Sequence, residues 1–438
     1  MTSVAAFSIL ALTVSLSLSR PSFGAVRIRH AEAGVIGAAL VLLLGIVPPD
    51  LALVTLRRLS LPVVTIVGLM VISLVAERAG LLGLVAQWMA RAAKGNGGRL
   101  FTYLFFCGTL VGTIFTNDAA VLIFTPLVFG LMEEIQEDSW SLRNKIPFYF
   151  AVLYVGNLVG ALVISNPINI IVSSLFGIRF LEYAIWMIAP AVVSMVVSFA
   201  GLKLFFRNLL PGRYRFSEDR IVRPKDRRFA VLSGVILFAT LLGFFSEDLT
   251  GIPTWLVALL GALTLLGVNT LMGYAASSVL KLVGWDVIVF VVGIFIVSTG
   301  LRNVGLTHYL GWILAQLSES SFSQLTFATG FVAAICSSIM NNHPTAGLMT
   351  WVIQDFSLSA FQTKMLVFSA LIGGDLGPKM LPIGSLAALM WFRMLRDRGI
   401  HISYSLYIKI GIPVTLVAIL LSIVTLNIEL LIYYWWTS

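Results

Sequence analysis

The sequence predicts an all-α polytopic membrane protein built from two inverted repeats, each with about five transmembrane helices, a re-entrant helical hairpin and a broken helix. Composition is the first reason, because 58% of the 438 residues are hydrophobic and 11% are charged, with a mean hydropathy of +0.97. A soluble domain of that balance would lack the polar side chains that its surface needs. The second reason is that long apolar runs follow the same order on both sides of one basic linker. These runs lack the alternation of apolar and polar residues that the strands of a transmembrane barrel show, so helices are favoured.

The first repeat is expected to span residues 1–206. Its apolar runs lie at about residues 4–19, 33–47, 61–76, 100–132, 148–175 and 182–206. The first of these runs has no basic n-region. We therefore expect a membrane helix there, with a signal sequence, cleaved or uncleaved, as the alternative.

The run at 100–132 (LFTYLFFCGTLVGTIFTNDAAVLIFTPLVFGLM) is too long for one crossing. At about 1.5 Å per residue it would make a helix of roughly 50 Å, whereas the hydrocarbon core is about 30 Å thick. We expect a hairpin that turns at Thr116-Asn117-Asp118 and leaves by the face it entered. The next run, 148–175, is interrupted at Ser165-Asn166-Pro167-Ile168-Asn169, which predicts a broken helix.

Residues 207–228 form the linker, and the second repeat is expected to span 229–438. The stretch 206–228 holds eight Lys/Arg against three Asp/Glu, with two prolines. After it the apolar runs restart at 229–245, 252–270, 285–301, 321–354, 365–392 and 405–434. The run 321–354 is again over-long and carries the polar sequence Asn341-Asn342-His343-Pro344-Thr345, so it predicts a second hairpin. The run 365–392 is broken at Gly373-Gly374-Asp375-Leu376-Gly377-Pro378-Lys379. Paired interrupted segments in two halves point to a transporter site at the repeat interface.

Charge predicts the topology. If the linker is cytoplasmic, the basic loops 20–32, 77–99 and 393–401 are also inside, and the acidic Glu247 and Asp248 are outside, as the positive-inside rule requires. Arg57 and Arg58 fall on the outer side against the rule, as snorkelling ends of a short helix would. The formal net charge of +9 is explained by the basic loops that set the topology, so no nucleic-acid partner is expected. The expected surroundings of the chain are a lipid bilayer.

Asp118 is the sharpest candidate, because an ionisable group inside an apolar membrane segment is a functional-site hypothesis by default. It is interpreted as a proton or cation site, and a capping role for the second hairpin helix is the structural alternative. Asp375 and Lys379 lie four residues apart. In a regular helix they would form an ion pair. Either they only neutralise each other in the break, or the pair opens during transport and Asp375 accepts a proton.

Amides gather at the four polar interruptions and offer donors and acceptors without net charge. They suit a small neutral hydroxyl-bearing solute or a partly dehydrated cation. His343, next to the second tip, is either a satisfied core residue or functional. The predicted solute-binding residues are Thr116, Asn117, Asp118, Ser165, Asn166, Asn169, Asn341, Asn342, His343, Thr345, Gly374 and Asp375. The predicted proton-coupling residues are Asp118, Asp375 and Lys379.

The two cysteines, Cys107 and Cys336, each stand alone in an over-long run and are interpreted as small apolar packing residues. No Walker sequence, haem motif or His/Cys metal cluster occurs, so we expect neither a cofactor nor a bound metal. Energy must then come from an ion gradient or from a separate partner.

Three stretches resemble signatures of the arsenite and antimonite efflux pumps, the arsenical pump membrane proteins of the ion transporter superfamily. They are FTNDAAVLIFTP at 115–126, MNNHPT at 340–345 and IGGDLGPK at 372–379, which continues through PIGSL at 382–386 to Trp391. His343 stands where the family is expected to have an apolar residue. The resemblance covers about residues 33 to 430.

The resemblance implies export of the neutral trihydroxides As(OH)3 and Sb(OH)3 in exchange for protons, by an elevator-like motion, in the cell inner membrane. It also implies that a cytoplasmic arsenite-stimulated ATPase is sometimes attached. The amides and hydroxyls fit a neutral trihydroxide, and a separate carboxylate would couple the proton. The alternatives are a sodium/proton antiporter on the same fold, a dicarboxylate transporter, and a membrane anchor that only recruits an ATPase.

Overall fold

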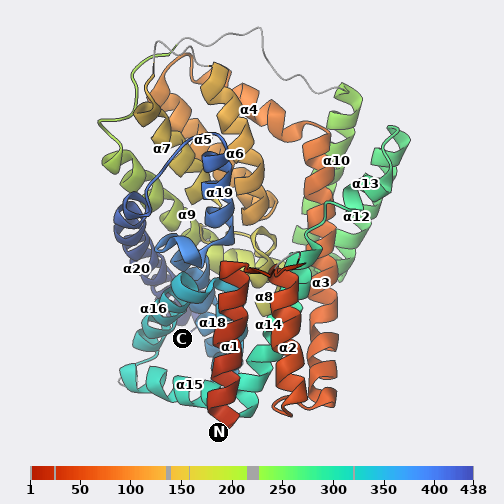
Figure 1. The fold of residues 1–438 in the computed structure, drawn as a ribbon. Helices are drawn as coiled ribbons and strands as arrows, with labels where there is room; N and C mark the ends of the chain where they lie inside the picture. The colour runs from red at the N-terminus through yellow and green to blue at the C-terminus, as the bar shows by residue number, and fades with distance from the viewer. Residues whose placement is uncertain are drawn as a thin grey trace.

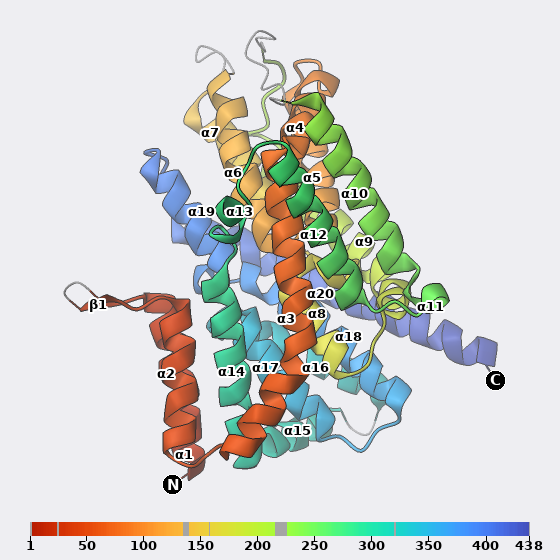
Figure 2. The ribbon, with the colours of Figure 1, turned by 90° about the vertical axis from the view of Figure 1, so that its right-hand side faces the viewer.

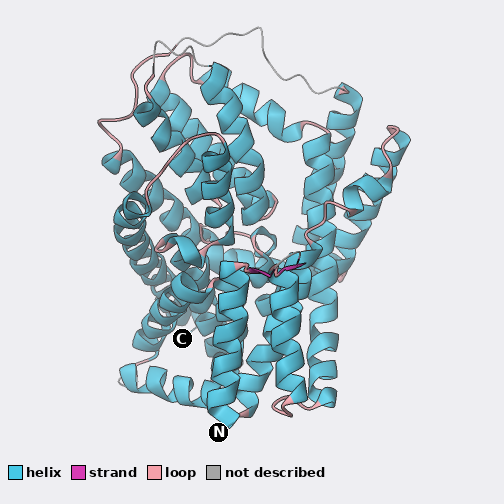
Figure 3. Cartoon of the chain, viewed as in Figure 1, coloured by secondary structure: helices cyan, strands magenta, loops and turns pink. Residues whose placement is uncertain are grey.

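A computed structural model describes residues 2–437 apart from 24–25, 135–139, 157, 215–225 and 319–320. The side chains of residues 23, 26, 117–119, 122–123, 134 and 437 also lie outside the description. The described chain is almost entirely helical (Figure 3). Within it the strands are two residues each, Ser22–Phe23 and Val26–Arg27, and they pair antiparallel between the first two helices. The predicted all-α membrane fold is confirmed.

The first half contains α1 (Thr2–Ser19), α2 (His30–Leu43), α3 (Pro49–Arg78), α4 (Leu81–Ala92), α5 (Gly97–Ile114), α6 (Asn117–Glu134), α7 (Leu142–Val155), the 3-10 turn η2 (Val163–Ser165), α8 (Pro167–Leu175) and α9 (Phe180–Phe205). The second half contains α10 (Arg227–Phe245), α11 (Glu247–Thr250), α12 (Thr254–Leu271), α13 (Ala276–Leu280), α14 (Trp285–Asn303), α15 (Leu306–Leu317), α16 (Phe322–Met340), α17 (Asn342–Gln354), α18 (Ala360–Leu376), the 3-10 turns η4 (Gly377–Lys379) and η5 (Pro382–Gly384), α19 (Leu386–Asp397) and α20 (Tyr404–Thr437).

Eight helices of the described chain are long and apolar enough to cross a membrane: α1, α3, α9, α10, α12, α14, α16 and α20. The hairpin helices α5 and α6 occupy the upper half of Figures 1 and 2, and α16 and α17 the lower half of Figure 2. The two hairpins therefore lie toward opposite ends of the molecule.

Two short helices were not expected. Residues 77–99, interpreted as a loop, contain α4, and the corresponding place in the second half holds α15. Each follows a left-handed glycine, Gly80 (φ 84°) or Gly305 (φ 80°), so the chain turns sharply before each of them. They lie at opposite ends of the molecule (Figure 1). α4 buries Leu82, Ala86 and Met89 along one face, as an amphipathic surface helix does.

The third membrane helix also differs from its expected bounds of 61–76. α3 is 30 residues long and begins at Pro49, which occupies the first helical position, where a missing N–H costs nothing. Arg57 and Arg58 are exposed on α3 and lie inside the helix, not at its end. Arginine is a good helix former, so an exposed face that carries two of them does not stop the helix.

Packing divides the helices into two bundles. In the first, which we call the scaffold bundle, α2 packs along α14, α3 along α12, and α1 and α10 join them. In the second, the hairpin bundle, α9 packs along α20, α16 along α18, and α5 to α8, α17 and α19 complete the group. The main contacts between the bundles are α14 with α17 and α3 with α8. The helix breaks therefore lie in the hairpin bundle, with α8 at its boundary.

Candidate functional site

The break in the first half is built by Asn166 and Pro167. η2 ends at Ser165, and Asn166, with extended backbone, caps α8 by accepting a hydrogen bond from the Ile168 N–H at 3.3 Å. Pro167 takes the first helical position, which needs no N–H donor. Asparagine followed by proline therefore stops one segment and starts the next at this point.

The break in the second half has the same order of parts. α18 ends at Leu376, η4 and η5 follow, and Ser385 caps α19 by accepting from the Ala388 N–H at 3.1 Å. A Cβ at Gly377 would overlap the Ala334 carbonyl of α16, and the space at Gly373 is as tight. These glycines let the broken segment lie directly on the second hairpin.

The two breaks meet at the Asp375 carboxylate, which is 1% exposed. Its Oδ1 accepts a hydrogen bond from Asn166 Nδ2 at 2.7 Å. Its Oδ2 accepts from Asn169 Nδ2 and from the Gly160 N–H, both at 3.0 Å. All three donors belong to the first half of the chain. Hydrogen bonds from three donors match an ionised carboxylate, which only accepts.

Gly160 was not among the predicted residues, although its N–H completes the site. A Cβ there would lie 2.5 Å from Asn169 Nδ2 and still closer to Ser165 Oγ. The Tyr183 hydroxyl of α9 donates to the Gly160 carbonyl at 3.1 Å and fixes that peptide. A glycine just before a polar interruption was the only signal in the sequence, and the tyrosine gave none.

Lys379 does not form the side-by-side ion pair with Asp375 that a regular helix would give. No salt bridge joins the two in the described part of the chain. The physical reason is that the α-helix ends at Leu376 and Lys379 lies in a 3-10 turn, so residues four apart are no longer stacked. The ammonium, 1% exposed, lies instead 4.9 Å from the centre of the Tyr154 ring, and Nζ has no hydrogen-bond partner among the described residues.

Asn341 forms the tip of the second hairpin. It has a positive φ of 77° with a ψ of 162°, a backbone that residues other than glycine adopt only at a cost in free energy. Its Oδ1 lies 3.3 Å from the His343 N–H and 3.1 Å from His343 Nδ1, and its carbonyl accepts from Thr345 Oγ1 at 2.8 Å. The residue therefore shapes the tip with both of its oxygens.

His343 is buried and packs edge-on against Phe290 of α14 at 6.1 Å. Its Nε2 has no hydrogen-bond partner among the described residues. With Asn341 and Asn342 it borders a cavity of about 10 Å³ whose other wall is the second break, including Pro378 and Ser385. That is about the room that one water needs.

The remaining predicted residues lie near these groups or outside the description. Ser165 donates to the Leu162 carbonyl at 2.6 Å, and Thr345 and Gly374 border a small cavity between α8, α17 and α18. Thr116 is buried at the first hairpin tip, and the neighbouring α5 packs against η2. The side chains of Asn117 and Asp118 lie outside the described residues, so their predicted roles are not tested by the structure.

The site therefore offers one carboxylate, two amides fixed by it and one ammonium, all out of water. No group of three or more His, Cys, Asp or Glu that could hold a metal ion occurs among the described residues. Cys107 and Cys336 are both free thiols, one in each hairpin. Such a set can bind hydroxyl groups and can take up or release a proton.

Comparison with known proteins places these features in a family. The family model for the arsenical pump membrane protein matches residues 4–430. An arsenical pump membrane protein of Escherichia coli K12 is 32% identical over 400 residues, which cover 90% of this chain and 92% of the relative. Another from Escherichia coli is 32% identical over 371 residues, 84% of this chain and 86% of the relative. The solved structure of the Alcanivorax borkumensis YdaH transporter has a TM-score of 0.57 and 16% identity, covering 98% of this chain and 97% of that one.

Proposed function

The chain belongs to the arsenical pump membrane protein family of membrane transporters, and from that premise we propose that it exports arsenite and antimonite from the cytoplasm in exchange for protons. The observation that carries the proposal is the Asp375 carboxylate, buried where the two helix breaks meet and held by three donors from the other half. A proton on this group would take the acceptor from one of those three hydrogen bonds.

The solute chemistry fits the donor set. Near neutral pH arsenite is the uncharged trihydroxide, which needs hydrogen-bond donors and acceptors and no counter-charge. Asn166 and Asn169 supply amides at the break, and Asn169 Oδ1 has no partner among the described residues. A buried amide oxygen without a partner costs free energy, so a solute hydroxyl that donates to it would be stabilised.

The proposed coupling is competition between proton and solute. With Asp375 ionised, both amides point their N–H groups at the carboxylate, and the amide oxygens receive the solute hydroxyls. When a proton enters from outside, the carboxyl becomes a donor, one of the three incoming hydrogen bonds loses its acceptor, and the amides turn away from the solute. Loading on the cytoplasmic side and release outside then alternate with deprotonation and protonation.

Asp118 is the second candidate for the proton-carrying group. It remains a prediction of the sequence, supported by the cost of a carboxylate in an apolar hairpin. Asp118→Asn is expected to abolish proton-coupled transport and to leave folding intact. Full arsenite/proton exchange by that variant would leave Asp375 as the only carboxylate with a proposed coupling role.

The remaining parts of the proposal concern the whole cycle. We propose that the hairpin bundle moves as a unit against the scaffold bundle in the cell inner membrane, as an elevator. The close packing of α9 along α20 and of α16 along α18 supports movement of the hairpin bundle as one body, and the contacts of α14 with α17 and of α3 with α8 are those that would have to slide. The basic linker that follows α9 supplies the cytoplasmic charge to which an arsenite-stimulated ATPase would bind.

The test is flux in proteoliposomes under an imposed pH gradient, with arsenite, sodium and succinate compared in the same preparation. Arsenite uptake driven by the gradient, with a matching proton flux that requires arsenite, is the expected result. Proton flux that depends on sodium and not on arsenite would replace the proposal by a sodium/proton antiporter. Dependence on succinate would point to a dicarboxylate transporter, and no flux at all to a membrane anchor for an ATPase.

A further inference from the structure

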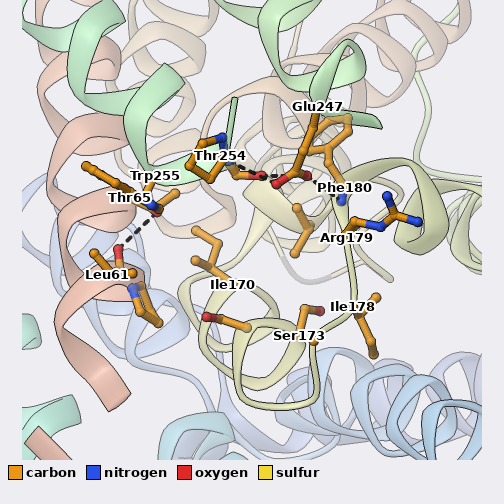
Figure 4. Close-up of a pocket in the computed structure, with 15 residues that line it drawn as sticks. Leu61, Thr65, Ile170, Ser173, Ile178, Arg179, Phe180, Glu247, Thr254 and Trp255 are labelled. Atoms are coloured by element: carbon orange, nitrogen blue, oxygen red, sulfur yellow. Dashed lines mark hydrogen bonds between the residues drawn. The ribbon is translucent and has the colours of Figure 1, made fainter. Parts of the chain in front are cut away.

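A cavity of about 220 Å³ lies at the boundary between the two bundles, on the side of α8 that faces the scaffold (Figure 4). Leu61 and Thr65 of α3 form one wall, and Ile170 and Ser173 of α8 form the other. The beginnings of α9 and α12 close it. It is far larger than either small cavity at the breaks, which measure about 10 Å³ each.

Glu247 anchors the polar rim of this cavity. Its carboxylate accepts hydrogen bonds from the Phe180 N–H at 3.0 Å, from the Thr254 N–H at 3.1 Å and from Thr254 Oγ1 at 3.0 Å. The Arg179 guanidinium forms an ion pair with Asp248 beside it. These bonds tie the start of α9 in the hairpin bundle to the start of α12 in the scaffold bundle. The rim is thus a contact between bundles that has to change if the bundles slide.

Polar groups on α8 connect the cavity with Asp375. Asn169, which donates to Asp375 Oδ2, and Ser173 lie four residues apart, so their side chains lie on one face about 5–6 Å apart. Asn169 Oδ1 and Ser173 Oγ both lack hydrogen-bond partners among the described residues, and both residues are at most 1% exposed. Ser174, the next residue, is exposed at the mouth of the cavity.

Apolar side chains separate the cavity from the Asp375 site in this conformation. Val163 of η2 and Ile170 of α8 border the cavity, and both are nearly buried. They belong to the same two elements as Ser165, Asn166 and Asn169. A small shift of α8 would therefore open or close the connection and would move the solute ligands at the same time.

The cavity opens to the face opposite the basic linker. α9 ends at the linker and begins at the cavity, and α10 begins at the linker and ends next to Glu247. Each helix is long enough to cross the membrane. With the linker cytoplasmic, the mouth at Ser174 and Arg179 faces outside.

We propose that this cavity is the release vestibule of the pump, where the neutral trihydroxide leaves the Asn166–Asn169–Asp375 site along Ser173. The inference rests on the proposed function. The space suits such a solute, because four heavy atoms with several waters fit in about 220 Å³ when each water takes about 30 Å³. The unpartnered Ser173 hydroxyl supplies the hydrogen bond that the solute needs on the way out.

The experiment blocks the mouth of the cavity with a reversible cysteine modification. Ser174→Cys is made in a Cys107→Ala/Cys336→Ala background and treated from outside with a bulky, membrane-impermeant methanethiosulfonate. The thiolate displaces sulfinate and forms a mixed disulfide. Arsenite efflux from cells is expected to fall tenfold or more and to recover after reduction with a phosphine that is washed out before the assay. Leu249→Cys is the matched control, since it is 90% exposed on α11 on the same face and does not line the cavity, and its modification should change nothing.

Each result has one meaning. If the protein with its own cysteines moves no arsenite, the proposed function fails and not the vestibule. If Ser174→Cys reacts from outside and efflux continues at the unmodified rate, or if it reacts only from the cytoplasmic side, the vestibule is overturned. Arg179→Cys, 64% exposed in the side chain at the same mouth, repeats the test should Ser174→Cys not fold.

Discussion

The Asp375 carboxylate is the residue on which proton coupling is expected to depend. In Asp375→Asn the side chain cannot ionise, and its NH2 group replaces one of the two carboxylate oxygens. That NH2 group is a donor and faces a donor of Asn166, Asn169 or Gly160, so at least one hydrogen bond is lost. We expect gradient-driven arsenite exchange to fall by about tenfold or more, corresponding to at least ~1.4 kcal/mol. The measurement is arsenite flux in proteoliposomes at a series of internal and external pH values.

Glu133→Gln is the control for Asp375→Asn. Glu133 is an exposed carboxylate near the end of α6, away from both breaks. Its replacement should leave the flux and its pH dependence unchanged. Unaltered pH-driven exchange by Asp375→Asn, in protein that runs as a single species on size exclusion, would remove Asp375 from the coupling mechanism.

Gly160 has no side chain, and the site depends on that. The added methyl group of Gly160→Ala would overlap Ser165 Oγ and Asn169 Nδ2 and reach within 3.4 Å of Asp375 Oδ2. We expect about 1–3 kcal/mol of destabilisation from overpacking and a loss of transport similar to that of Asp375→Asn. Thermal unfolding in detergent and arsenite flux measure the two effects. Gly83→Ala, on α4 with open space around it, is the matched substitution, and it should neither destabilise the protein nor reduce transport.

At the scale of residues, the sequence located Asn166, Asn169 and Asp375 because each belongs to a polar interruption in an apolar run. It could not pair them, since a contact between residues about 200 positions apart depends on how the halves pack. The role of the Gly160 N–H could not be predicted either, because a backbone donor has no sequence signature. Helical spacing would pair Asp375 with Lys379 only in a regular helix, and the α-helix ends one residue after Asp375.

At the scale of elements, the second hairpin depends on Asn341 adopting a positive-φ, extended backbone (φ 77°, ψ 162°) between α16 and α17. Glycine adopts this backbone readily, and alanine is strained there by about 1–3 kcal/mol. Asn341→Ala should therefore be less stable than Asn341→Gly, and the preference of a helix N-cap for glycine over alanine acts in the same direction. Thermal unfolding of the two purified variants decides, and equal stability would mean that the tip does not need its observed backbone.

Elements were predictable where the length of an apolar run, or a proline or glycine inside it, marks a boundary. The over-long runs gave two helix pairs, Asn166-Pro167 lies where α8 starts, and Gly377-Pro378 lies where α18 gives way to a 3-10 turn. α4 and α15 were missed because each has 12 residues, which is shorter than a membrane crossing needs, so neither stands out as a helix by its length of apolar sequence. The full length of α3 was missed because Arg57 and Arg58 were taken as its boundary.

At the scale of the whole molecule, two ion pairs distinguish motion between the bundles from motion within one. Arg302 of α14 and Asp355, directly after α17, are joined at 3.1 Å across the two bundles. Lys364 of α18 and Glu182 of α9 are joined at 2.6 Å inside the hairpin bundle. Both pairs are partly exposed, so both can be replaced by cysteines that a reagent reaches. The sequence alone suggested neither pair, because each joins helices that only the folded packing brings together.

We expect a short bifunctional maleimide to stop arsenite exchange in Arg302→Cys/Asp355→Cys and to leave it in Glu182→Cys/Lys364→Cys, both in the cysteine-free background. A linker is needed because side chains of this length hold the backbones beyond disulfide reach. Each single cysteine, treated with a monofunctional maleimide, controls for the loss of the ion pair itself. If the bundles slide past each other during transport, only the link between them is an obstacle. Unchanged exchange with the Arg302–Asp355 link in place would mean that the solute crosses without that motion, and the cavity beside α8 would then have to open by local movement of α8 alone.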